Sequence, residues 1–211
     1  VLTILGSAAA EGWPALYCTC DACAEALRRG GKDIRRRTSY RLGEHIQIDF
    51  GPDTFSSSIT FGLDTACITD LVLTHNHPDH FTPHELYYRR EGFSRVPPEN
   101  TLRVHGPQGV GDEIHSHLGD LDRYRLGFEA LEPYHERELA DGVTVVALPA
   151  THAPDIGGAY NYVFRVGEGE LLIAHDTGWW TEEVWQYISS RRVTVALIDC
   201  TYGAKQERRG H

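Results

Sequence analysis

The sequence predicts an α/β fold in which two packed mixed sheets are flanked by helices, an αββα sandwich. Short apolar runs bounded by Gly, Pro or polar residues recur along the chain, as expected for buried strands. Helical segments fall between the later runs. The length of 211 residues and the hydrophobic share of 41% suit one domain with its own core. Composition alone supports only a mixed α and β protein, so the order of the elements carries the prediction.

The expected elements follow from these runs. The strands, in chain order, are residues 1–5, 40–42, 45–50, 67–74, 101–105, 143–150, 160–166, 171–174 and 193–200, and residues 124–135 offer a further strand with polar edges. Helices are expected over residues 22–28, 83–90, 108–118 and 181–189. The sequence Gly-Glu-Gly-Glu at residues 167–170 indicates a hairpin turn. No repeat, low-complexity segment or long linker interrupts residues 1–211, so a single domain is expected.

Charge and hydropathy limit the classes of partner. The formal net charge of −10 disfavours a nucleic-acid surface, which needs clustered Lys and Arg. The basic runs 35–37 and 191–192 are interpreted as solvated faces. No apolar stretch approaches the roughly 20 residues that span a membrane. Residues 1–6 have no basic region and are interpreted as a strand rather than a signal peptide, so a cytoplasmic location is expected.

The most informative motif is an H-x-H-x-D-H pattern, formed by His75, His77, Asp79 and His80 directly after the apolar run 70–73. Imidazole and carboxylate groups are ligands for Zn²⁺, Mn²⁺ or Fe²⁺. The i, i+2 spacing of the first two histidines returns both to one face of an extended backbone. The last two residues lie where the chain can turn toward a second metal. A surface histidine cluster is the alternative interpretation.

This pattern resembles the metallo-β-lactamase superfamily, and later strand ends agree with the resemblance. His152 follows the run 143–150 and matches the third histidine of the family. Asp176 follows the run 171–174 and matches the carboxylate that bridges two metals. Asp49 matches an early aspartate that supports the ligands without binding metal. The resemblance therefore implies the metallo-β-lactamase-type form of the αββα sandwich.

A second motif, C-x-C-x-x-C, is formed by Cys18, Cys20 and Cys23. In a cytoplasmic chain, closely spaced cysteines indicate metal rather than disulfides. Three thiolates leave a tetrahedral zinc one ligand short, and a histidine elsewhere is the expected fourth. Three free thiols in a loop are the alternative.

Together with Gly6, Gly12 and Pro14, the cysteines make the chain similar to one branch of the superfamily. This branch includes the phosphoribosyl cyclic phosphate phosphodiesterases of the carbon–phosphorus lyase pathway and the coenzyme PQQ biosynthesis B proteins. The resemblance implies one structural zinc at the cysteines. It also implies two histidines beyond residue 211, one for this zinc and one for the second catalytic metal. His211 matches a family histidine that contacts the scissile phosphate. The absence of Met and the end at His211 lead us to expect that Met positions and a C-terminal tail are missing from the sequence.

The resemblance further implies a metal-dependent hydrolase with two divalent metals, Mn or Zn with Fe also compatible. The implied ligands are His75, His77, His152 and Asp176 for one metal, and Asp79, His80 and Asp176 for the other. A bridging hydroxide would attack the substrate. The favoured function is a phosphodiesterase on a small phosphate ester, cyclic esters included. The alternatives are a thioesterase, lactonase or tRNA-processing nuclease, or a PQQ-biosynthesis-type protein. The expected partner is a small molecule, with no membrane and with nucleic acid disfavoured; a homodimer is compatible.

Three further residues close to the strand ends have expected roles. His175 precedes Asp176 and should point to the opposite face if the strand is regular. Asp199 could orient a ligand, and Cys200 is interpreted as a buried thiol.

Overall fold

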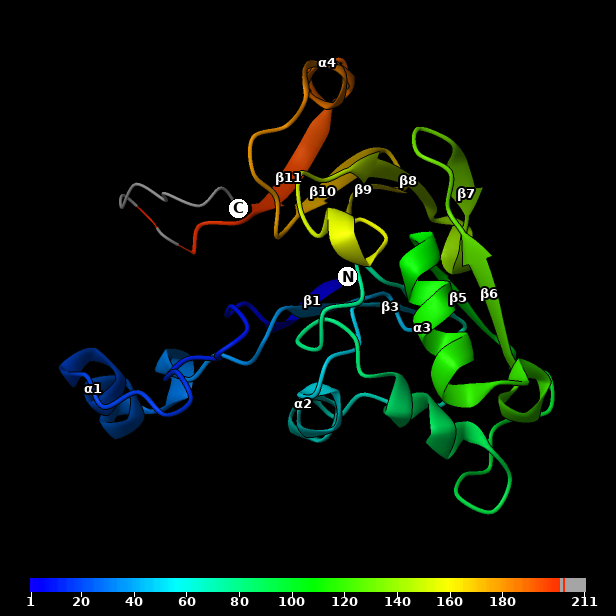
Figure 1. Ribbon diagram of the computed structural model, residues 1–211, viewed down its shortest axis with the longest axis horizontal. Helices are drawn as coiled ribbons and strands as arrows, with labels where there is room; N and C mark the ends of the chain where they lie inside the picture. The colour runs from blue at the N-terminus through cyan, green and yellow to red at the C-terminus, as the bar shows by residue number, and fades with distance from the viewer. Residues whose placement is uncertain (202, 204–211) are drawn as a thin grey trace.

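Two sheets packed face to face form the centre of the protein (Figure 1). The computed structural model describes residues 1–201 and residue 203. The first sheet has the strand order β1 (Leu2–Gly6), β2 (Ser39–Leu42), β3 (Ile46–Ile48), β4 (Asp70–Val72), β5 (Leu102–Gly106) and β6 (Leu126–Ala130). The second has the order β11 (Val193–Ile198), β10 (Gly169–Ala174), β9 (Tyr160–Val166), β8 (Thr144–Pro149) and β7 (Glu136–Glu138).

Both sheets are mixed. Strands β1 to β3 pair antiparallel, whereas β3 to β6 run parallel to their neighbours. In the second sheet β7 to β10 are antiparallel, and β11 is parallel to β10. Because the parallel strands β3, β4 and β5 end at the same edge, the loops that follow them meet there.

The core between the sheets is built from alternating strand residues. Ile46, Ile48 and Val72 of the first sheet belong to the same buried cluster as Tyr162 and Phe164 of the second. Each of these side chains is fully buried, so the two inner faces exclude water. The αββα prediction is therefore confirmed.

Helices cover the outer faces of both sheets (Figure 1). Beside the first sheet lie α3 (Gln108–Leu118) and the 3-10 segment η2 (Pro83–Arg89), and α2 (Thr54–Phe61) follows β3. Helix α4 (Glu182–Ser189) packs Val184 against the second sheet. The shorter 3-10 segments are η1 (Gly31–Asp33), η3 (Leu121–Tyr124), η4 (Ala140–Gly142) and η5 (Pro154–Ile156). Helix α1 (Asp21–Arg29) extends away from the sheets. Within the described residues, no helix combines the length and apolar character that crossing a membrane requires.

Several expected elements differ from the structure. Residues 67–74 form only the three-residue strand β4, because the chain leaves the sheet before the histidine motif. Residues 83–90 form a 3-10 segment, and residues 124–135 are divided between η3, β6 and a loop. Helix α2 was not predicted, since its large apolar residues Phe55 and Ile59 face outward and leave no amphipathic pattern. Strand β7 was missed because all its residues are exposed and charged.

Candidate metal centre

The histidine motif lies at the edge where the parallel strands of the first sheet end. Leu73 N donates to His105 O, which extends the β4–β5 pairing by one residue, and Tyr160 N of the second sheet donates to Thr74 O. The loop then packs on Gly51, where an added Cβ would lie 2.1 Å from Asp79 O. Only glycine permits this approach. The motif is thus fixed between both sheets rather than exposed on a surface loop.

His75, His77 and His152 form a group in which one ring nitrogen from each residue lies within 4.8 Å of the others. The His75 Nε2 and His77 Nδ1 atoms are 2.9 Å apart, and His152 Nε2 is 3.2 Å from the same Nδ1. His75 is fully buried, and burial followed by the charge of His80 lowers its pKa to about 2. Three converging imidazoles, one of them held neutral, are a donor set that fits a zinc-like cation.

A second group shares His75 and adds His80 and Asp176. The His80 Nε2 atom lies 2.6 Å from Asp176 Oδ2 and 3.3 Å from Asp79 Oδ2. Burial opposes a charge on His80, but the charge of Asp49 and the hydrogen bond with Asp176 outweigh it and raise the pKa of His80 well above its ordinary value. Burial likewise opposes ionisation of Asp176, while its contact with His80 lowers the Asp176 pKa. Carboxylates concentrated around a buried imidazole fit a divalent cation.

Asp49 lies behind His80 and fixes its orientation. Its carboxylate is fully buried, accepts hydrogen bonds from Thr74 N (2.9 Å) and Thr74 Oγ1 (3.0 Å), and is 2.7 Å from His80 Nδ1. With Nδ1 engaged, His80 presents Nε2 to the ligand group. Sequence inspection did not single out Thr74, because a threonine at a strand end gives no signal until Asp49 is brought beside it.

Three residues in the loops that carry the candidate ligands and Asp49 adopt left-handed backbone conformations. The φ angles are 56° for Asp49, 50° for Ala153 and 44° for Asp176. Such conformations are unfavourable for residues other than glycine and concentrate at functional sites. Ala153 directly follows His152, whose loop is fixed against α3 because a Cβ on Gly109 would lie 2.1 Å from Ile156 O. Packing therefore holds these turns in backbone conformations that their residues would not otherwise prefer.

The expectation that His175 points away from Asp176 is wrong. Both side chains line the same cavity, because β10 ends at Ala174 and the left-handed turn at Asp176 interrupts strand alternation. The hydroxyl of Tyr40 on β2 is hydrogen-bonded to His175 Nε2, so these residues form one wall. Tyr40 is a cavity residue that the sequence did not indicate.

The cavity has a volume of ≈ 800 Å³ and connects the second ligand group with the N-terminal loop. Its lining includes His80 and Asp176 on one side and residues of the segment Ser7–Ala15 on the other. Asp199 also lines it, but its carboxylate accepts hydrogen bonds from the backbone N and Oγ1 of Thr201. Cys200, which follows the end of β11, is exposed rather than buried. His211 lies outside the described residues.

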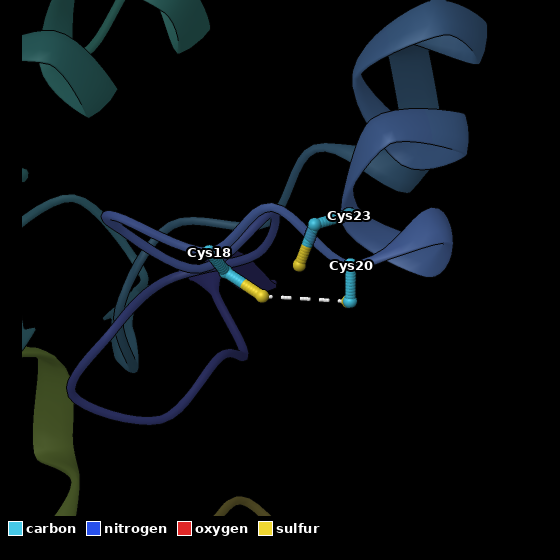
Figure 2. A group of neighbouring side chains, drawn as sticks. All are labelled: Cys18, Cys20 and Cys23. Atoms are coloured by element: carbon cyan, nitrogen blue, oxygen red, sulfur yellow. Dashed lines mark hydrogen bonds between the residues drawn. The ribbon is translucent and has the colours of Figure 1, made fainter.

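The three cysteines of the second motif converge at the start of α1 (Figure 2). Their sulfur atoms lie within 4.8 Å of one another, and Cys18 Sγ is 3.3 Å from Cys20 Sγ. The backbone N–H of Cys23 and then the thiol of Cys18 lower the pKa of Cys20, which favours the thiolate that binds metal. Within the described part of the chain, the group contains these three sulfur ligands and no fourth residue.

The profile of a beta-lactamase superfamily domain matches residues 44–211, which leaves the cysteine group outside the matched range. No curated protein matches the sequence significantly.

Solved structures share the fold. A diphosphatase from the PhnP family has a TM-score of 0.69 and 19% identity, covering 92% of this chain and 71% of that chain. Zn(2+)-bound PqqB from Methylobacterium extorquens has a TM-score of 0.73 and 17% identity, covering 94% and 72%. The short form of human tRNase Z has a TM-score of 0.54 and 17% identity, covering 83% and 70%. At these identities the likeness shows the fold alone.

Proposed function

The chain belongs to the beta-lactamase superfamily, whose members with this fold are metal-dependent hydrolases, and on this basis we propose that it hydrolyses a small phosphate ester, cyclic esters included. The observation that carries the proposal is the pair of ligand groups that share His75. One is rich in imidazole and the other combines imidazole with carboxylate. Two adjacent donor sets of this kind support a centre for two divalent cations.

In this proposal His75, His77 and His152 would hold one cation, and His80 with Asp79 would hold the other. Asp176 would serve both, since its Oδ2 atom lies 3.8 Å from His75 Nε2 and 2.6 Å from His80 Nε2. When bound, the two cations would supply a water of lowered pKa and positive charge for the developing negative charge.

The other roles belong to the protein's own side chains. Asp49 and Thr74 orient His80, so that its Nε2 atom stays directed to the shared carboxylate. The complete burial of His75 excludes solvent behind the centre. Tyr40 and His175 form the wall beside Asp176, where they can contact a substrate held in the cavity. The cysteine group would hold a structural zinc that fixes the loop on the opposite side.

A phosphate ester is favoured over a carbonyl substrate because a diphosphatase is among the structures that share the fold and the N-terminal cysteine motif resembles the phosphodiesterase branch. The second candidate is a PQQ-biosynthesis-type role, which the TM-score of 0.73 to PqqB supports. A tRNA-processing nuclease is disfavoured by the net charge of −10.

The test compares substrates on protein loaded separately with Mn²⁺ or Zn²⁺. An aryl phosphodiester, a ribose cyclic phosphate, a thioester and a lactone would be assayed beside an Asp176→Ala variant whose folding is checked by circular dichroism. We expect turnover of a phosphodiester that is lost in the variant. Turnover of only the thioester or lactone, or of nothing with two metals bound, would overturn the phosphodiesterase proposal.

A further inference from the structure

The cavity wall opposite the metal ligands is made by two segments that pair through Trp13 and Arg35. Trp13 N donates to Arg35 O (2.9 Å) and Arg35 N donates to Trp13 O (2.7 Å), which forms an isolated antiparallel bridge. Residues directly opposite each other in such a pair project their side chains to the same face. Both residues line the cavity that also contains His80 and Asp176.

Arg35 differs from the two arginines that follow it. Arg36 donates to Ser56 Oγ and Thr60 Oγ1, and Arg37 forms an ion pair with Asp53. Arg35 is exposed, and among the described residues no carboxylate lies within salt-bridge distance of it. The interpretation of residues 35–37 as a uniform solvated face is therefore too simple. Two of these arginines fasten the loop, while Arg35 borders the cavity.

The other charged residues around the cavity distinguish Arg35 as a binding group for an anion. Glu11 and Asp199 also line the cavity, and Asp199 already accepts two hydrogen bonds from Thr201. His80 and Asp176 belong to the ligand groups. Among the described residues that line the cavity, Arg35 is the one arginine or lysine, so an anionic group bound away from the metal centre would be directed to it. A guanidinium binds phosphate or carboxylate through paired hydrogen bonds.

Trp13 supplies the apolar part of the same wall. It is 36% exposed, so part of its ring is available to a ligand. A tryptophan beside an arginine can pack against a planar ring while the guanidinium binds a charged substituent on that ring.

We propose that Trp13 and Arg35 form a specificity site for the part of the substrate that is not attacked. The inference rests on the proposed function and narrows it. The preferred substrates are phosphate esters in which the retained group contains a ring and a second anionic substituent. The ring packs on Trp13, and the anionic substituent binds Arg35.

The kinetic test uses two aryl phosphodiesters that differ only on the retained ring, one with a carboxylate and one with a carboxamide. We expect the wild-type protein to prefer the carboxylate about tenfold or more in kcat/KM, as for a charge-assisted hydrogen bond. Arg35→Gln should abolish this preference by raising KM for the carboxylate ester, so that the two esters have similar kcat/KM values in the variant. Lys32→Gln removes the same charge from the same region without touching the cavity and should retain the preference. Trp13→Leu should lower kcat/KM for both esters alike.

A binding measurement separates this inference from the proposed function. Calorimetry would compare the aryl phosphate monoesters that correspond to the two retained groups, on wild-type and Arg35→Gln protein. Tighter binding of the carboxylate monoester by the wild-type protein, with this preference lost in Arg35→Gln, supports the specificity site. If no diester is hydrolysed, that failure overturns only the phosphodiesterase proposal. Equal preference in wild-type, Arg35→Gln and Lys32→Gln proteins overturns the specificity site, whether or not diesters are hydrolysed.

Discussion

Asp49 and Asp141 each contact a histidine Nδ1 atom at 2.7 Å, yet their surroundings differ completely. The Asp49–His80 pair is buried, whereas the Asp141–His45 side chains are 40% and 39% exposed. A buried carboxylate that orients a ligand histidine commonly changes metal affinity by about 10–100-fold when it is replaced. An exposed pair contributes little.

We therefore expect Asp49→Asn to weaken binding of the cation that we propose His80 to hold by about 10–100-fold. Asp141→Asn, the matched change at the exposed pair, should leave both affinities unaltered. Metal content after dialysis and competition titration with a chelator would measure the difference. Equal affinities in the two variants would show that Asp49 does not orient a ligand.

The low pKa of His75 predicts a pH dependence of stability in the metal-free protein. Burial, then the charge of His80, lowers this pKa to about 2, so the folded state leaves His75 neutral where the unfolded state protonates it. In the unfolded chain His75 has the ordinary histidine pKa of about 6.5 and is protonated below that pH. Burying neutral His75 therefore lowers the free energy of unfolding as the pH falls below about 6.5, by up to about 1.4 kcal/mol per pH unit. His80, whose pKa is raised, acts in the opposite direction: its contribution is complete below about 6.5 and is lost as the pH rises through its raised value.

Urea unfolding at pH 5, 6 and 7 in the presence of a chelator would test these signs. Relative to wild type, His75→Gln should gain stability as the pH falls from 7 to 5. His80→Gln should lose stability over the same interval. A parallel response of the two variants would contradict the assigned directions.

Among the elements, the N-terminal loop is held by contacts that the sequence only partly reveals. The spacing of the cysteines predicted their convergence, because residues so close in sequence are neighbours in almost any backbone conformation. The pairing of Trp13 with Arg35 was not predictable, since it joins segments separated by α1 and η1. Similarly, the motif residues His75 and His77 follow from local alternation, whereas the cavity-facing position of His175 depends on a left-handed turn that carries no sequence signal at Asp176.

The cysteine group should control the shape of the cavity wall. Cys18 N donates to Ala15 O, and Ala15 lines the cavity, so the group and the wall are continuous. We expect Cys20→Ser to abolish zinc binding at the group, to raise KM and to change kcat little. Cys67→Ser, which alters a thiol outside the group, should change neither. Zinc content and steady-state kinetics of both variants would decide; normal zinc content in Cys20→Ser would sink the assignment.

For the whole molecule, Asp70 links the two sheets far from the ligand groups. Its buried carboxylate accepts hydrogen bonds from Arg103 (2.7 Å) and Ala140 N (3.0 Å) and is 2.9 Å from His105 Nε2. Arg103 and His105 belong to β5 of the first sheet, while Ala140 begins the segment that leads into β8 of the second. Despite burial, the hydrogen bonds of His105 and Arg103 lower the pKa of Asp70. The contribution of Asp70 to the free energy of unfolding is therefore present at pH values above its ordinary pKa of about 3.9. This contribution is lost as the pH falls through the lowered pKa of the folded state.

Removing this carboxylate should destabilise the fold without altering the metal ligands. Asp70→Ala leaves buried polar partners uncompensated, and breaking a buried pair typically costs about 3–5 kcal/mol. Asp120→Ala removes a carboxylate that caps the short segment η3 at the surface and should cost only about 0.5–2 kcal/mol. Urea unfolding at pH 7 would measure both losses. Because Asp70 contacts none of the ligand residues, metal content per folded molecule should stay at the wild-type value in both variants. Asp70→Ala could instead lose metal at temperatures where it remains folded. That result would mean that the alignment of the two sheets, and not only the local loops, holds the ligand groups together.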